Sequence, residues 1–346
     1  MPTLESPLAL APSIRHNLAL FHCPACAGTL QAAADNARLE CQSCRRSFAS
    51  DHGIPLLFWP SEWTDKADVT EIVKAFYEDT PFPNYDDLDS PDSLRAKAER
   101  GVFARLLNEQ LPHGSKILEC GCGTGQLSNY LGLTWGRLVF GTDICLNSLR
   151  LGQAFHARHA IPAVSFAQMN LFRPIFRPAT FDLVISNGVL HHTSDPFLAF
   201  KSILTCVKRG GFIIIGLYNT YGRLSTDLRR ALFRLTGDRL TFLDPRLRLS
   251  GLSRLRKTAW FKDQYKHPHE SKHSFDEVLG WFDRCGVTFM NSIPKSTPTD
   301  TFSDHERLFE AHPPGSSFDH LLVQLGMAVS GGREGGFFIM IGRKNT

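Results

Sequence analysis

Short apolar segments alternate with amphipathic segments along the chain from residue 116 onward. The amphipathic ones, such as Ser148–His159 and Pro196–Val207, carry apolar residues at helical spacing. The apolar ones have the pattern of buried strands. Five of them follow one another: Ile117–Cys120, Arg137–Asp143, Ala163–Met169, Phe181–Ser186 and Gly210–Gly216. Repeated strand–helix units predict an α/β fold with a doubly wound parallel sheet, whose ligands bind at the carboxyl ends of the strands.

Further elements flank this series. Upstream, Ser90 and Pro91 are typical of a helix start, with serine as the N-cap and proline in the first turn. Downstream, Gly286–Met290 and Gly336–Ile341 predict a late hairpin that adds two strands to the sheet. The α/β domain is therefore expected to occupy residues 91–346.

Two C-x-x-C pairs near the N-terminus predict a metal site. The pairs are Cys23–Cys26 and Cys41–Cys44. They can present four thiolates to one tetrahedral zinc ion. Between them, Thr29–Gln31 and Arg38–Glu40 predict hairpin strands. A unit this small buries little surface, so the metal is expected to supply much of its stability. A thioredoxin-like redox site is the alternative, but it would have one pair in a βαβ setting.

These patterns divide the chain into parts. The parts are a flexible tail (1–16), a zinc-ribbon module (17–60), a linker or lid (61–90) and the α/β domain (91–346), which has insertions at about 219–270 and 294–334. The third part contains Pro81 and Pro83 among aromatic residues, which enforce an extended path. It is expected either to fold over a ligand or to lie on the surface.

The composition is that of an ordinary globular protein and argues only against membrane-spanning and secreted classes. The chain has 346 residues, 42% of them hydrophobic and 21% charged, and a net charge of +4, all ordinary for a globular protein. It has no apolar run of about 20 residues, so no membrane span is expected. The N-terminus lacks the basic start of a secretory signal. Four of the nine cysteines have metal-site spacing and the others lie in apparent core segments, which favours the reducing cytoplasm.

The stretch Lys116–Gln126, reading KILECGCGTGQ, joins a strand to a helix through glycines that allow close approach of a ligand. Its G-x-G-x-G spacing differs from the G-x-G-x-x-G of dinucleotide-binding proteins. It resembles the first motif, E/D-x-G-x-G-x-G, of class I S-adenosylmethionine (SAM) methyltransferases, which have a Rossmann-like seven-stranded sheet. The resemblance implies that this turn contacts SAM through Glu119, Gly121, Cys122, Gly123 and Gly125. An ordinary tight turn, or a nicotinamide-type site, is the alternative.

The resemblance implies further cofactor contacts at the next two strand ends. Asp143 closes the second strand, at the place of an acid that binds ribose hydroxyls, and Ile144 follows it. Asn170 occupies the position of a residue that reads the adenine amino group, with Leu171 beside the ring. Alternatively, Asn170 only caps its turn.

The fourth strand ends in SNGVLHHTSDP, residues 186–196. This resembles the V-L-H-H-x-x-D-P stretch of small-molecule methyltransferases, including those of ubiquinone and menaquinone biosynthesis, and implies that Asn187 lies beside the methionine part of SAM. The absence of D-P-P-Y and N-P-P-Y disfavours the DNA and glutamine amino-methylating class. His191 and His192 are candidate bases, or only shape the pocket, and Tyr218 ends the fifth strand facing the same crevice.

The first insertion is strongly basic: residues 219–262 contain eleven Lys or Arg against three Asp. Four leucines recur there at helical spacing: Leu224, Leu228, Leu232 and Leu235. The segment could grip a phosphate backbone or an anionic substrate, or could be a solvated helical lid. The following stretch, Asp263–His273, holds three histidines that could bind a second metal or act as a base, although an ordinary polar loop is favoured. In the second insertion, Phe318–Val329 is an apolar helix candidate.

Three functions are therefore weighed. The first is a SAM-dependent methyltransferase with a structural Zn²⁺ that acts on a small or carrier-borne metabolite. The second is an RNA methyltransferase that holds nucleic acid with its ribbon and basic insertion. The ribbon is similar to methyltransferase-activator zinc ribbons and to the zinc module of some 23S rRNA guanine methyltransferases. The third is a non-catalytic binding protein, which would not need an intact Glu119, glycine and Asp143 set. The oligomeric state stays open.

Overall fold

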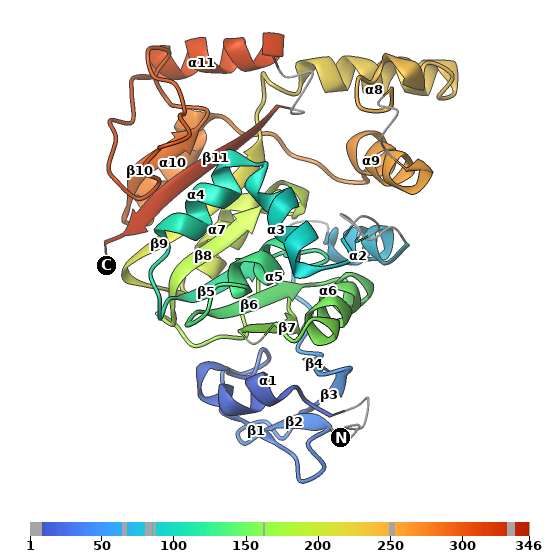
Figure 1. The fold of residues 1–346 in the computed structure, drawn as a ribbon, viewed down its shortest axis with the longest axis vertical. Helices are drawn as coiled ribbons and strands as arrows, with labels where there is room; N and C mark the ends of the chain where they lie inside the picture. Colours follow the sequence, from blue (N-terminus) through green and yellow to red (C-terminus); the bar gives the residue numbers. More distant parts are fainter. Residues whose placement is uncertain are drawn as a thin grey trace.

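The computed structural model describes residues 9–63, 68–79, 85, 88–161, 163–248, 253–330 and 336–345. A seven-stranded sheet with the order β10-β11-β9-β8-β5-β6-β7 forms its centre (Figure 1). The strands are β5 (Lys116–Cys120), β6 (Leu138–Asp143), β7 (Val164–Gln168), β8 (Phe181–Asn187), β9 (Val207–Tyr218), β10 (Val287–Ile293) and β11 (Phe337–Lys344). Strands β5 to β9 are parallel, and β11 runs antiparallel to β9 and β10. The predicted doubly wound sheet is confirmed.

Helices cover both faces of the sheet, and each face has its own apolar core. One core joins α3 (Pro91–Glu99), α4 (Val102–Gln110), α5 (Gln126–Gly132) and α6 (Leu146–Arg158) to the sheet. The other joins α7 (Pro196–Leu204) and α10 (Phe275–Arg284) to it. The N-cap prediction is confirmed, because Ser90 and Ser93 form a reciprocal capping box. The chain after Pro91 forms two helices, α3 and α4, because Gly101 adopts an extended conformation between them.

The N-terminal module contains α1 (Pro12–His16), the 3₁₀ turn η1 (Leu18–Leu20) and a four-stranded antiparallel sheet. Its strands are β1 (Leu30–Ala32), β2 (Arg38–Cys41), β3 (Ser47–Asp51) and β4 (Ile54–Pro55). The first two form the predicted hairpin. The module packs directly on the large sheet: the Phe21 ring lies 5.6 Å from that of Phe140 and 4.6 Å from that of Phe176. Its core is therefore continuous with the core of the α/β domain.

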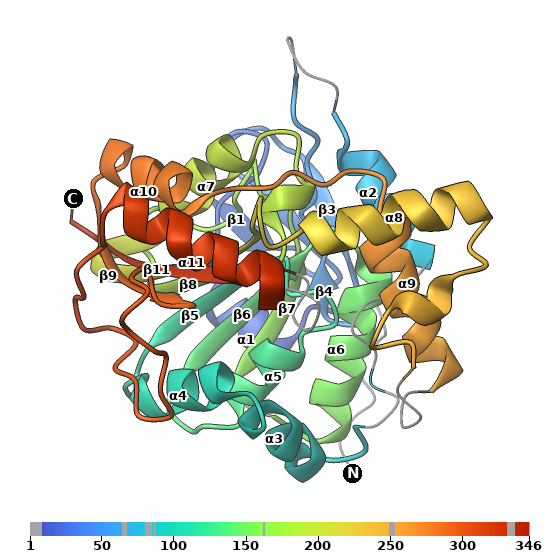
Figure 2. The same cartoon turned by 90° about the horizontal axis from the view of Figure 1, so that it is seen from above.

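The remaining elements come from the linker and the insertions. They are α2 (Thr70–Asp79), η2 (Leu190–His192), α8 (Leu224–Thr236), η3 (Thr241–Leu243), α9 (Arg254–Lys266) and α11 (Ser317–Ser330). Residues 80–84, the proline-containing part of the expected lid, and part of the tail fall outside the described residues. Figures 1 and 2 show α8 and α11 at the end of the molecule opposite the N-terminal module. No helix among the described residues is long and apolar enough to cross a membrane.

Candidate functional site

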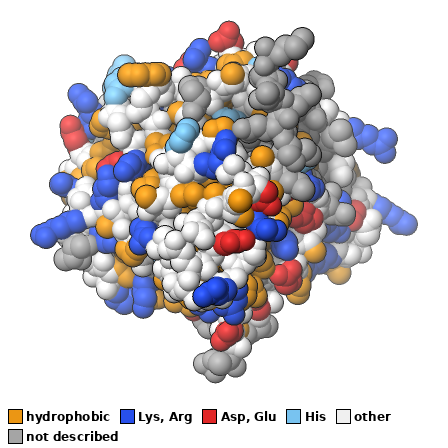
Figure 3. Space-filling view, turned by 90° about the horizontal axis from the view of Figure 1, so that it is seen from below, with side chains coloured by type: hydrophobic (Ala, Val, Ile, Leu, Met, Phe, Trp, Pro, Cys, Tyr) orange, Lys and Arg blue, Asp and Glu red, His pale blue; other side chains and the backbone are white. Residues whose placement is uncertain are grey.

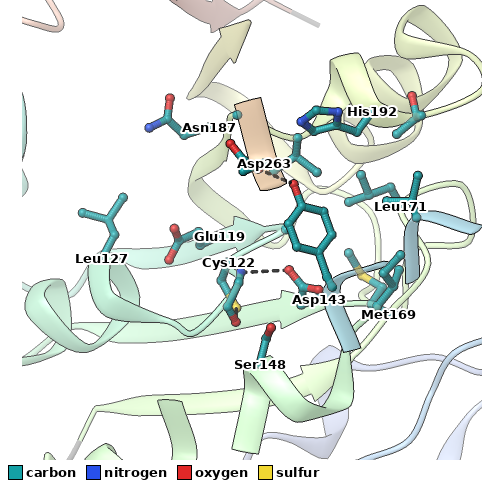
Figure 4. A pocket seen from close by; sticks show the side chains of 18 of the residues that line it. Glu119, Cys122, Leu127, Asp143, Ser148, Met169, Leu171, Asn187, His192 and Asp263 are labelled. Carbon is teal, nitrogen blue, oxygen red and sulfur yellow. Dashed lines mark hydrogen bonds between the residues drawn. The ribbon is translucent and has the colours of Figure 1, made fainter. Parts of the chain in front are cut away.

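A cavity of about 660 Å³ lies at the carboxyl ends of β5, β6, β8 and β9. Most residues predicted from the motifs line it: Glu119, Gly121, Cys122, Gly123, Asp143, Ile144, Asn170, Leu171, Asn187, His192 and Tyr218. Gly125 and His191 lie outside this lining. In Figure 4, Glu119 and Asp143 lie at one side of the cavity, and His192 and Asp263 lie at the other. The topology therefore brings the predicted strand-end residues together.

The glycine turn after β5 has a backbone that only glycine adopts readily. Gly121, Gly123 and Gly125 have φ of 71°, 53° and 70°, in the left-handed region. A Cβ on Gly125 would also lie 2.4 Å from the Phe166 ring, and one on Gly121 would lie 2.4 Å from Val189. Gly125 is the N-cap of α5, so it shapes the turn from behind the cavity.

Asp143 ties this turn to the end of β6. Its Oδ2 accepts a hydrogen bond from the Gly123 N–H at 2.8 Å, and its Oδ1 accepts one from the Cys145 N–H at 2.8 Å. Burial raises the pKa of Asp143, and the backbone donors oppose that rise. A carboxylate has about four acceptor positions, so Asp143 can bind ligand hydroxyls while it holds the turn.

Glu119, at the end of β5, is buried in the cavity wall. Its Oε2 accepts a hydrogen bond from the Ser128 hydroxyl at 2.5 Å. Burial raises the pKa of Glu119 to about 7 from an ordinary value of 4.5. This carboxyl group is therefore poised to ionise when a cationic ligand approaches it.

Glu119 makes the stability of the unliganded protein depend on pH. Between pH 4.5 and 7 the folded state holds a proton that the unfolded state releases, so stability falls as pH rises through this window. Glu119→Gln removes this penalty and keeps an acceptor for Ser128. We expect the variant to be more stable than the wild type by about 3 kcal/mol at pH 8 and equal to it at pH 4. Urea unfolding at both pH values measures this, with the surface substitution Glu109→Gln as control; an equal difference at both pH values would contradict it.

Two other predicted cofactor residues, Asn170 and Asn187, differ in whether their side chains are already hydrogen-bonded within the protein. Asn170 is 2% exposed and uses its side chain inside the chain: Nδ2 donates to the Trp59 carbonyl at 2.9 Å and to the Ser61 hydroxyl at 3.1 Å, and Oδ1 accepts from the Phe172 N–H. This arrangement corresponds to the turn-capping alternative. Asn187, in contrast, lies at the exposed end of β8 and reaches the cavity.

The three candidate catalytic residues lie together but in different environments. The His192 Nδ1 is 2.9 Å from the His269 carbonyl, so Nδ1 carries the proton and Nε2 keeps its lone pair. Burial lowers the pKa of His192 to about 4. Tyr218 accepts a hydrogen bond from the Gln264 amide at 2.8 Å. His191 is completely buried, and its ring centroid lies 4.1 Å from that of Tyr218.

The wall opposite the glycine turn comes from α2, within the predicted linker or lid, and from α9 of the first insertion. Tyr77 of α2 donates a hydrogen bond to the Asp263 Oδ1 at 3.0 Å, and Gln264 donates to the Asp263 Oδ2 at 2.8 Å. Burial raises the pKa of Asp263. Arg246 and Trp260 also line the cavity. In the sequence, only the polar stretch that begins at Asp263 indicated these residues. No local pattern predicts that this stretch lies across the cavity from the ends of β5 and β6.

A buried ion pair fixes this wall in place. Arg223, which is 0% exposed, binds Glu270 through two nitrogens at 3.1 and 2.6 Å and donates to the Gln264 Oε1 at 2.5 Å. Its guanidinium also lies 3.8 Å above the Tyr218 ring. Arg230 binds the same Glu270 at 2.9 Å. Two arginines of the basic insertion are therefore structural.

The four cysteines of the N-terminal module converge on one point. The sulfur atoms of Cys23, Cys26, Cys41 and Cys44 all lie within 4.8 Å of one another. The Cys23–Cys44 and Cys26–Cys41 separations are 3.7 and 3.5 Å. Four thiolates at about 2.3 Å from a tetrahedral zinc ion would be about 3.8 Å apart, so the group fits a metal ion.

The histidine-rich stretch after α9 forms no such group in the part of the chain that the structure describes. Instead, His267 stacks on His192 with ring centroids 3.7 Å apart, and the His269 Nε2 lies 3.1 Å from the Thr193 carbonyl. These contacts hold the His192 turn against the insertion.

Comparison with known families agrees with the geometry of the cavity. Residues 118–215 match the family described as a methyltransferase domain. They contain the end of β5, the strands β6, β7 and β8, the glycine turn and Asp143. The chain carries a methyltransferase domain over residues 118–215.

The relatives of this chain are proteins of different lengths. An uncharacterized protein of Synechococcus is 27% identical over 69% of this chain and 61% of its own length. A ubiquinone biosynthesis O-methyltransferase of Albidiferax ferrireducens is 27% identical over 31% of this chain and 42% of its own. Among solved structures, magnesium protoporphyrin IX methyltransferase of Synechocystis PCC 6803 is similar, with a TM-score of 0.46 and 14% identity. The alignment covers 79% of this chain and 99% of the other. This chain thus spans less than two thirds of the length of the first two relatives.

Proposed function

We propose that the protein transfers a methyl group from SAM to a small or carrier-borne metabolite. The observation that carries this proposal is the polar wall of Tyr77, Asp263 and Gln264 on the side of the cavity opposite the glycine turn. An acceptor has to enter the space between this wall and the turn. That geometry suits a small molecule, or the end of a carrier arm, better than a folded polymer.

The cavity residues fit SAM, which when bound supplies an electrophilic methyl group on a sulfonium ion. We assign the ribose hydroxyls to Asp143 and the positive charge of the methionine part to Glu119 and Asn187. The glycine turn brings its backbone close to the ligand. Ile144 and Leu171 supply apolar contacts for the adenine ring. Because the donors of Asn170 are already engaged, its role in this proposal is to hold the Trp59–Ser61 segment and Leu171 beside the ring.

Methyl transfer is an in-line displacement that depends mostly on positioning and on exclusion of water. A base is needed only when the acceptor keeps its proton. We propose that the His192 Nε2 takes this proton, since its Nδ1 is fixed on the His269 carbonyl. Tyr218 and Asp263 then orient the acceptor. His191, which is enclosed behind them, supports the ring of Tyr218.

His192→Gln tests this assignment. We expect methyl transfer to fall by about 10²-fold while SAM affinity changes by less than about 3-fold. Because the pKa of His192 lies near 4, the wild-type rate should not vary between pH 6 and 9 through this group. Single-turnover methyl transfer measures the effect, and His113→Gln, far from the cavity, is the control. An unchanged rate in His192→Gln would remove the histidine from the mechanism.

The competing RNA substrate is less well supported by the basic insertion. Arg223 and Arg230 face inward and form ion pairs with Glu270, so their guanidinium groups are not available to bind phosphates. Transfer of a radiolabelled methyl group from SAM to extract fractions distinguishes the two. We expect label in the small-molecule or carrier-protein fraction. Label confined to the RNA fraction would overturn the proposed substrate class.

For the N-terminal module we propose a structural zinc ion on the four cysteines. The convergence of the four sulfur atoms within 4.8 Å of one another supports this proposal. None of the nine cysteines forms a disulfide bond, which supports our proposal that the protein works in the reducing cytoplasm.

A further inference from the structure

Two insertion helices, α8 and α11, present apolar side chains to solvent. Nine of the thirteen large exposed hydrophobic residues among those that the structure describes belong to α8, η3 and α11. Eight of them form what we call the outer face: Leu224, Leu228 and Leu235 of α8, and Phe318, Leu321, Leu322, Leu325 and Val329 of α11. Val329 is 91% exposed and Leu235 is 85% exposed. Apolar surface concentrated in this way usually marks an interaction site.

The outer face is one side of each helix. On α11 the exposed residues follow one another at intervals of three and four, which places them on a single stripe. The inward side of α11 includes polar residues. His320 bonds Asp276 at 2.9 Å, and the Gln324 Oε1 accepts hydrogen bonds from Asn219 and from the Phe275 N–H. Met327 and Val323 also pack on the core from this side, so α11 is held by polar and apolar contacts while its leucines stay exposed.

Helix α8 likewise exposes leucines, although its Phe233 is buried against α9. The three outer-face leucines point outward together with Ala231, whereas Arg223 and Arg230 turn inward to Glu270. These leucines are 53%, 73% and 85% exposed, so they contribute little to the core of the described residues. Their presence on both helices indicates that something outside the chain covers them.

The two helices share one end of the molecule. In Figures 1 and 2 they lie nearly end to end on the side opposite the N-terminal module. Asn219, just before α8, donates to Gln324 of α11 at 2.8 Å, and its N–H donates to the Gly336 carbonyl at 2.7 Å. These bonds tie the start of α8 to α11, so both stripes lie at the same end of the molecule.

Basic residues border this surface. Arg234 and Arg239 are exposed near the end of α8 that carries Leu235. The opposite end of the molecule, seen in Figure 3, mixes basic and acidic side chains among apolar ones. Aliphatic side chains bordered by arginines match a bilayer with anionic headgroups, which takes up apolar groups and attracts basic ones.

We propose that the outer face docks the protein onto the surface of an anionic lipid membrane, with α8 and α11 lying in the plane of the interface. A protein partner fits less well. Protein interfaces carry about one hydrogen bond per 100–200 Å² and rely on Trp, Tyr and Arg anchors. The exposed stripe of α11, in contrast, consists of aliphatic and phenyl side chains with Gly326 and Ser317. This proposal is independent of the methyl acceptor.

Flotation of the full chain with lipid vesicles tests the proposal. The probes are vesicles of phosphatidylcholine alone and vesicles in which about a third of the lipid is phosphatidylglycerol. We expect the wild type to bind the anionic vesicles. Leu321→Ser combined with Leu322→Ser should weaken binding by about 100-fold, roughly ten-fold for each side chain withdrawn from the lipid. Arg234→Gln with Arg239→Gln should weaken it by about 5-fold per arginine on anionic vesicles only.

A matched control pair separates docking from damage to the fold. Leu151 and Leu198 are 39% and 37% exposed, close to the 37% and 40% of Leu321 and Leu322, but lie on α6 and α7. Leu151→Ser with Leu198→Ser should bind vesicles within about 2-fold of the wild type. Equal loss in both pairs, or no binding of the wild type, would overturn the proposal. So would sedimentation of the wild type as a dimer that Leu321→Ser with Leu322→Ser dissociates, because the outer face would then join two copies.

Discussion

Asp143→Ala should weaken SAM binding by at least about 100-fold. The Asp143 carboxylate accepts hydrogen bonds from the Gly123 and Cys145 N–H groups, both at 2.8 Å. Hydrogen bonds to a charged group contribute about 1.5–3 kcal/mol each, and loss of 2.7 kcal/mol corresponds to about 100-fold in affinity. The substitution frees the glycine turn, whose backbone N–H groups are expected to contact the ligand. It also removes the acceptor that we assign to the ribose.

Two controls make this prediction specific. Asp143→Asn keeps an oxygen for one N–H group and should lose about ten-fold less affinity than Asp143→Ala. Asp182→Ala removes a carboxylate that accepts the Lys116 N–H at 2.8 Å, but at the other end of the parallel strands. It should leave SAM affinity unchanged. Calorimetric titration measures all three, and equal losses for Asp143→Ala and Asp182→Ala would show that the effect is only one of stability.

Loss of the metal site should have the second large effect. Cys26→Ser combined with Cys44→Ser leaves two thiolates, too few for a structural zinc site. Zinc binding in small modules provides about 10–16 kcal/mol at neutral pH. We therefore expect the N-terminal module to unfold and zinc content to fall from about one ion per chain to none. Atomic absorption and proteolysis of residues 9–63 measure these changes.

The damage should extend beyond the module. Phe21 packs on Phe140 and Phe176, so unfolding of the module exposes part of the large sheet. The midpoint of thermal unfolding should fall for the whole protein. Cys285→Ser, outside the cluster, is the control and should keep both the zinc and the midpoint. Wild-type zinc content in Cys26→Ser with Cys44→Ser would contradict the four-thiolate site.

Periodicity predicted most of the fold because each βα unit is encoded locally. The five parallel strands differ from their predicted bounds mainly at the ends, as for β9, which begins at Val207 rather than at Gly210. The capping box at Ser90 was predictable for the same reason. The break at Gly101 was not, since the apolar spacing runs across it.

The orientation of the insertions could not be predicted from local pattern. The leucines of α8 indicated an amphipathic helix, and the structure turns their stripe outward because Glu270, far along the chain, draws Arg223 and Arg230 inward. Similarly, the motif placed Asn170 at the cavity, but its donors are used by Trp59 and Ser61 from the linker. Contacts between distant segments decide such details, and a motif contains only one of the two partners.

The most direct test of the central claim is calorimetric titration of SAM into wild-type protein loaded with zinc. We expect one site per chain with a micromolar dissociation constant, and no heat from a nicotinamide dinucleotide in the same cell. Absence of SAM binding by the zinc-loaded protein would contradict the assignment of the cavity. It would leave a methyltransferase fold that serves as a scaffold.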